Sequence, residues 1–159
     1  MPDASLPTRP AIASEAEPAA NRRTVHPLVR LDYPVRVIAY LFASLAIASI
    51  FEARPPGTTT WVALAIWTFV WPHAAYLIAR RSARSKQVEM ANLAFDTGMM
   101  GLWSALCGLD LLLTIVLFTA INTANLSTGG MPGSLRGLAA YLVGALLGVA
   151  IVGFEFHQS

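Results

Sequence analysis

The chain has 159 residues, of which 55% are hydrophobic and only 13% are charged. Because a typical soluble domain is about 25% charged, this composition, with its mean hydropathy of +0.56, favours a membrane protein. The net charge of +2 is too small for a nucleic-acid-binding protein, and the single cysteine, Cys107, excludes an intrachain disulfide and a multi-cysteine metal site.

The N-terminal segment, residues 1–27, is rich in Pro, Ala and Glu and has no apolar run. A signal peptide needs an apolar core of about 7–15 residues, so we interpret this segment as a disordered tail. A membrane domain is expected to follow over residues 28–155. Near its start, Pro34 is expected to begin or end a helix, and Arg36 is expected to reach the lipid headgroups.

The charged residues divide the remaining chain into apolar stretches of roughly 20 residues, the length that crosses a bilayer as a helix. Turn-forming residues separate these stretches, most clearly at 108–110 and 127–134. The sequence therefore predicts an all-α fold, a polytopic transmembrane helix bundle. Its five spans are predicted near residues 35–53, 60–79, 90–107, 110–126 and 136–154.

Positive charges between these spans indicate the orientation of the bundle. Arg and Lys gather on the N-terminal flank and in the loops after the second and fourth spans, whereas the alternate loops contain only Arg54. Since loops rich in Arg and Lys stay in the cytoplasm, we expect a multi-pass protein with a cytoplasmic N-terminus.

Polar residues inside the spans are candidates for function, because a charged side chain there costs about 2.5–3.5 kcal/mol on insertion scales. Asp96 and His73 are expected at matching depths, roughly 10 Å and 9 Å below the cytoplasmic face, and Asn122 lies near that depth. Glu89, Asn92 and Asp96 have the spacing of one helix face. The sequence therefore predicts a polar cluster of His73, Asn92, Asp96 and Asn122, with Glu89 on the same face.

The predicted cluster has three interpretations. It can be a hydrogen-bonded lock that fixes the register of the helices. It can also be a site that senses a ligand or a proton, because His titrates near neutral pH and a neighbouring carboxylate shifts that titration. A metal site has the least support, since no His-x3-His or similar spacing is present; we assign no metal and no cofactor.

The second predicted span contains a proline beside aromatic residues. Pro72 removes a backbone hydrogen bond and should bend this helix, which makes it a candidate hinge. Trp67, Trp71 and Trp103 could line a pocket, although packing in the core is the simpler interpretation.

Small residues form a stripe on the fifth predicted span. Ala140, Gly144 and Gly148 recur at intervals of four, and Gly144 and Gly148 form a GxxxG motif, which permits close approach of two helices. Gly101 belongs to a stripe of the same spacing in the third span. We expect these stripes to pack within the chain, with dimerisation as the alternative.

No enzyme motif is present: the sequence has no GxSxG, Walker loop, GxGxxG or HExxH, and no catalytic residue is assigned. Two other functions remain open from the residues alone. A small proton- or cation-coupled transporter would use Asp96, since carriers rely on intramembrane carboxylates. A helix-packing subunit would need no ligand at all.

The motif Trp71-Pro72-His73 resembles the signature of the second class of membrane-associated sensor domains, the MASE series. The resemblance covers roughly residues 28–155. Its further residues follow in the order and at the spacing of that family: Glu89, Asn92, Leu93, Asp96, Gly101, Trp103, Asn122, Gly129 and Gly130.

The resemblance implies a sensory input module of a bacterial second-messenger system, signalling through cyclic di-GMP or cyclic AMP. Members of the family precede a GGDEF diguanylate cyclase or a class III adenylate cyclase, and their sensor resembles a six-helix unit. This sequence has five predicted spans and no GGDEF motif, so we expect a chain without its output domain and without enzymatic activity. We expect it in the inner membrane, in the lipid bilayer, as a homodimer or in association with a full-length cyclase.

Overall fold

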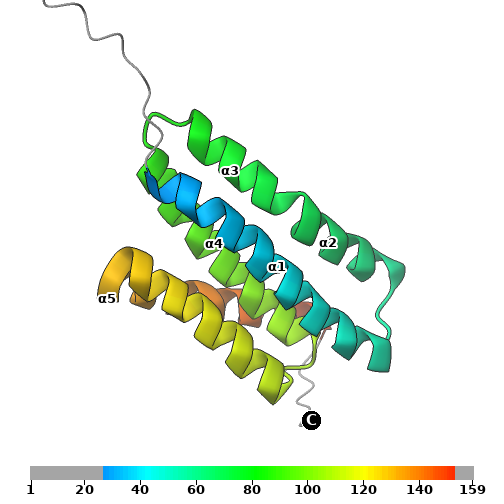
Figure 1. The fold of residues 1–159 in the computed structure, drawn as a ribbon. Helices are drawn as coiled ribbons and strands as arrows, with labels where there is room; N and C mark the ends of the chain where they lie inside the picture. Colours follow the sequence, from blue (N-terminus) through cyan, green and yellow to red (C-terminus); the bar gives the residue numbers. More distant parts are fainter. Residues whose placement is uncertain (1–26, 153–159) are drawn as a thin grey trace, which may run out of the picture.

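The computed structural model describes residues 27–152, apart from the side chain of residue 28, and this part of the chain is entirely helical outside its turns. The predicted all-α fold is therefore confirmed there, whereas the predicted tail before residue 27 and the end of the predicted domain after residue 152 lie outside the described residues. The helices in chain order are α1 (Pro27–Ala53), α2 (Thr58–Phe69), α3 (Trp71–Arg81), α4 (Ser85–Leu106) and α5 (Leu111–Val152). In Figure 1, α1 lies beside α2, α3 and α4, and α5 packs mainly against α4.

Helix α1 continues through Pro34, so the expectation that Pro34 begins or ends a helix is wrong. A proline inside a helix removes one hydrogen bond, and tertiary packing can offset that loss. On one side of Pro34, Val29 is 1% exposed, and on the other Arg36 is 5% exposed. Because both neighbouring turns are anchored in the bundle, the chain stays helical across the proline.

The second predicted span is broken into α2 and α3, which meet at Val70 with a bend of 42°. Pro72 stands in the first turn of α3. It cannot donate a hydrogen bond to the carbonyl of Thr68, and its ring crowds that carbonyl. The bend predicted from Pro72 is therefore confirmed, and it lies at Val70, two residues before the proline.

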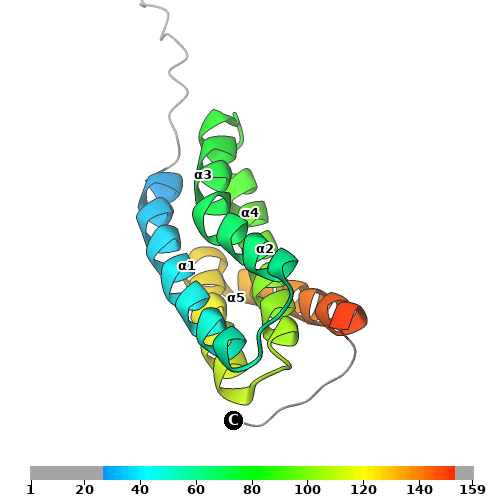
Figure 2. The ribbon, with the colours of Figure 1, turned by 90° about the vertical axis from the view of Figure 1, so that its right-hand side faces the viewer.

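Helix α5 has 42 residues, or about 60 Å at 1.5 Å per residue, twice the thickness of a bilayer core. It is interrupted at Gly130, whose φ of 61° and ψ of −157° are not helical. Figure 2 shows the chain turning sharply within α5. We call residues 111–129 the first arm and residues 131–152 the second arm. Of the loop predicted over 127–134, only Gly130 departs from helical backbone angles. Glycine allows the sharp turn there because it tolerates positive φ.

Aromatic side chains fill the core between α1, α2 and α4. The rings of Trp67 and Trp103 lie 5.5 Å apart, and Tyr40 lies 4.4 Å from Trp67. Cys107 is 4% exposed in the same core, where a free cysteine packs as a small apolar residue.

Two of the described helices are long and apolar enough to cross a membrane, Val29–Ala53 and Leu111–Val152, and the number rises to three if the bent pair α2–α3 forms one span. The five predicted spans are therefore not confirmed. Helix α4 begins at Ser85, earlier than the predicted 90–107, and includes Lys86, Glu89 and Asp96, which lower its hydropathy. Large apolar side chains nevertheless cover the outside of the bundle, as a lipid-facing surface requires.

Candidate functional site

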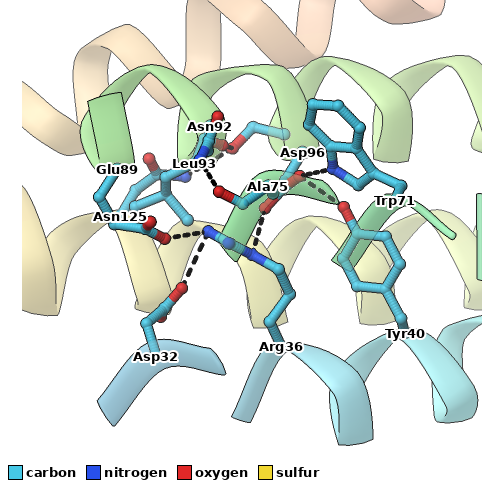
Figure 3. A network of polar contacts seen from close by, with 11 residues as sticks. Asp32, Arg36, Tyr40, Trp71, Ala75, Glu89, Asn92, Leu93, Asp96 and Asn125 are labelled. Carbon is cyan, nitrogen blue, oxygen red and sulfur yellow. Dashed lines mark hydrogen bonds and ion pairs between the residues drawn. The ribbon is translucent and has the colours of Figure 1, made fainter. Parts of the chain in front are cut away.

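A buried arginine joins α1 to α4. Arg36 is 5% exposed, and its guanidinium pairs with three carboxylates. The distance from Arg36 Nη2 to Asp32 Oδ2 is 2.9 Å, and that from Arg36 Nε to Asp96 Oδ2 is also 2.9 Å. The third partner is Glu89 Oε1. Figure 3 shows Arg36 between these side chains.

Asp96 is the best-satisfied carboxylate of the site. Its Oδ1 accepts hydrogen bonds from the Tyr40 hydroxyl at 2.5 Å and from the Trp71 indole at 2.6 Å, while its Oδ2 faces Arg36. Asp96 is only 2% exposed. One carboxylate thus ties α1, α3 and α4 together, because each of its donors comes from α1 or from α3 (Figure 3).

Glu89, Asn92 and Asp96 share one buried face of α4, as their spacing predicts. Asn92 donates a hydrogen bond to the carbonyl of Ala75 at 3.1 Å. Glu89 binds Arg36 through Oε1, whereas its buried Oε2 has no hydrogen-bond partner within residues 27–152. We call Asp32, Arg36, Tyr40, Trp71, Glu89 and Asp96 the Arg36 network.

The Arg36 network contains more negative than positive groups. If all three carboxylates were ionised, two negative charges would remain in excess of Arg36. Buried charges without a counter-charge cost several kcal/mol each. Protonation of a carboxylate would offset this excess, so the network is chemically suited to respond to protons.

His73 lies outside the Arg36 network. It is exposed, and its Nδ1 is 2.8 Å from the hydroxyl of Tyr33. Residues two apart on a helix point in nearly opposite directions, so the inward orientation of Trp71 turns His73 outward. His73 and Asp96 therefore do not meet at their matching depth, because depth along a helix does not determine the face on which a residue lies.

Asn122 also lies outside the network. It is half-buried and accepts a hydrogen bond from Ser134 at 2.7 Å, between the two arms of α5. The buried asparagine of α5 is Asn125, which donates to Thr97 Oγ1 of α4 at 2.8 Å and is 3% exposed. Asn125 occupies the point where the two arms and α4 meet.

The three predicted pocket tryptophans have different surroundings. Trp67 and Trp103 lie in the aromatic core, and Trp71 is a donor of the Arg36 network. An apolar groove of about 240 Å³ lies instead between α4 and the second arm of α5. None of these tryptophans lines the groove. Its lining residues are Phe95, Gly98, Met99, Leu102, Ala140, Val143, Gly144 and Leu147.

The stripes of small residues meet where the second arm of α5 crosses α4. A Cβ placed on Gly144 would lie 1.8 Å from the carbonyl oxygen of Gly98, and one on Gly101 would lie 2.1 Å from that of Tyr141. A Cβ on Gly148 would lie 2.9 Å from the carbonyl oxygen of Leu102. A Cβ on Gly98 would lie 3.4 Å from the carbonyl oxygen of Ala140. The predicted packing residues thus bring two backbones of the same chain into contact.

Sequence reasoning missed the centre of the network. Arg36 is buried in the bundle and does not reach the headgroups, so that expectation is wrong, and Tyr40 is a member that the predicted cluster lacks. A signal was available, because Asp32, Arg36 and Tyr40 repeat at intervals of four and therefore share one helix face. Within the described residues, no group of three His, Cys, Asp or Glu side chains could hold a metal ion.

Comparison with known proteins places this site within a recognised domain. Residues 31–119, more than half of the chain, match the MASE2 domain. This range includes every member of the Arg36 network. The match ends within the first arm of α5.

Two curated relatives carry the same printed name, "Probable diguanylate cyclase DgcC", in Escherichia coli K12 and in Escherichia coli O6:H1 strain CFT073. Each is 29% identical to this chain over 109 residues, which make up 69% of this chain and 29% of the relative. The chain therefore matches less than a third of each relative. No solved structure matches the chain.

Proposed function

Because the chain belongs to the MASE2 domain family, we propose that it is a membrane sensory input module of a bacterial second-messenger system. The named relatives are diguanylate cyclases, which favours cyclic di-GMP over cyclic AMP as the messenger. The module has no catalytic role of its own. It acts from the inner membrane, with a cytoplasmic N-terminus, on a cyclase that contains a related domain.

One observation carries this proposal: the buried Arg36 network joins α1, α3 and α4 through charged groups (Figure 3). A change in the charge of Glu89 or Asp96 alters how strongly these helices are held together. The bend at Val70 gives α3 a separate orientation from α2, and Pro72 is the hinge. A signal that changes the ionic state of the network therefore shifts the helix packing.

The same geometry argues against the transporter alternative. A carrier carboxylate must become accessible from each side of the membrane in turn. Asp96 is held by Arg36, Tyr40 and Trp71 and is 2% exposed. This arrangement favours a carboxylate that holds helices together over one that carries a substrate across the membrane.

The test uses an Escherichia coli relative in which the aligned stretch is replaced by that of this chain. Cyclic di-GMP is measured in cells that carry the chimera and its Arg36→Gln and Asp96→Asn variants. Coupling energies of about 1–3 kcal/mol predict a change of on the order of fivefold or more. Arg54→Gln, outside the network, is the matched control and should leave the output unchanged. Equal output from all four folded proteins would contradict the proposal.

A further inference from the structure

Exposed basic side chains gather at one end of the bundle. They come from the start of α1, the last turn of α3, the following turn and the start of α4, which lie together at one end in Figure 1. All five are exposed. We call them the basic end: Arg30, Arg80, Arg81, Arg84 and Lys86.

The basic end has no acidic counterpart within residues 27–152. Of the described carboxylates, Asp32, Glu89 and Asp96 pair with Arg36. Asp110 is buried beyond the far end of α4, where it accepts a hydrogen bond from the amide of Leu113. Glu52 lies in the last turn of α1, at the opposite end of that helix from Arg30. The positive charge of the basic end therefore faces outward.

Exposed apolar side chains lie directly beside these cations. Leu31 is 72% exposed next to Arg30, and Ile78 is 51% exposed one helical turn before Arg81. Leu77 is 43% exposed on the same turn of α3. A row of cations above an apolar surface matches a phospholipid, which has an anionic headgroup above an acyl chain.

We propose that the basic end binds the headgroups of anionic phospholipids and holds the ends of α1, α3 and α4 together. The charge pattern favours lipid over nucleic acid, because the cations border an apolar surface and the net charge is only +2. Lys86 lies one turn before Glu89, so a lipid bound there contacts the helices that form the Arg36 network. This binding does not depend on the proposed signalling function.

The test measures lipid binding to the purified full chain in detergent by native mass spectrometry, with phosphatidylglycerol and with phosphatidylcholine. The wild-type chain should prefer phosphatidylglycerol, and the preference should fall as salt is raised. Two double variants, Arg80→Gln/Arg81→Gln and Arg84→Gln/Lys86→Gln, should each lose about tenfold or more of this preference. The matched control is Arg54→Gln, which removes an exposed charge at the other end of α1. This variant should retain the preference for phosphatidylglycerol.

Equal binding of the two lipids by the wild-type chain would overturn the proposal. So would an equal loss in the Arg54→Gln control, or tight binding of duplex DNA without a preference between the lipids. Helical content is checked by circular dichroism for each variant. If one double variant does not fold, the other still tests the basic end.

Discussion

Arg36 of α1 and Asp96 of α4 form a buried ion pair with 2.9 Å between Nε and Oδ2. The side chains of the pair are 4% and 2% exposed, so water screens their interaction only weakly. This pair, with Glu89 and Tyr40 around it, fixes how α1 and α4 lie against each other. Substitutions of Arg36 and of Tyr40 therefore test how α1 and α4 are held together.

Removal of Arg36 should destabilise the chain strongly. Arg36→Ala leaves Asp96 and Glu89 buried without their cation, and breaking a buried pair from one side costs about 3–5 kcal/mol. The measurement is the free energy of unfolding in detergent, followed by circular dichroism. Arg54→Ala, which removes an exposed arginine at the end of α1, should change the free energy of unfolding by no more than about 0.5 kcal/mol. Similar losses in both variants would contradict the buried network.

The neutral donors to Asp96 should contribute less than Arg36. Tyr40→Phe removes one hydrogen bond to a charged group, which is worth about 1.5–3 kcal/mol, and keeps the ring that packs on Trp67. Tyr76→Phe is a matched control, because Tyr76 contacts the ring of Tyr33 and does not belong to the Arg36 network. Equal stability of wild type and Tyr40→Phe in the same unfolding assay would exclude the contact with Asp96.

Close backbone contact should make Gly144 intolerant of any side chain. Gly144→Ala would place a Cβ 1.8 Å from the carbonyl oxygen of Gly98, so the second arm must move away from α4. Overpacking of this kind costs about 1–3 kcal/mol, and sometimes more. Gly57→Ala is the control, since nothing lies within 4 Å of its added Cβ. If Gly144→Ala unfolds at the same temperature as the control, the second arm does not cross α4 as described.

The turn within α5 should depend on glycine at position 130. Its φ of 61° and ψ of −157° lie in a region that is essentially restricted to glycine, and strain there costs about 1–3 kcal/mol. Gly130→Ala should therefore lower the unfolding free energy, although an added Cβ would meet only Pro132 Cδ, at 3.9 Å. Distance measurements between spin labels on the two arms would reveal whether α5 straightens. An unchanged distance with unchanged stability would argue against the sharp turn.

Substitution of His73 should have little effect on the Arg36 network. His73 is exposed and contacts Tyr33, so His73→Ala should alter stability by no more than about 0.5 kcal/mol. Asp96→Asn, measured in parallel, should destabilise the chain clearly more. A larger effect from His73 than from Asp96 would support the cluster predicted from the sequence over the observed one.

Sequence patterns alone predict the helical class of the described residues, the bend near Pro72 and the shared face of Glu89, Asn92 and Asp96. These features follow from local periodicity and from backbone chemistry, which act over a few residues. The family resemblance was also readable from the order of Trp71-Pro72-His73 and the residues after it, and the match to the MASE2 domain agrees with it.

Which polar residues meet depends on how the helices pack against one another. Sequence fixes the depth of a residue along its helix, whereas rotation about the helix axis depends on packing. Trp71 therefore faces Asp96 while His73 faces Tyr33, and Asn125 rather than Asn122 enters the core. Likewise, Arg36 is buried because α1 passes uninterrupted through Pro34 and meets carboxylates of α4, and no local rule brings two distant segments together in that way.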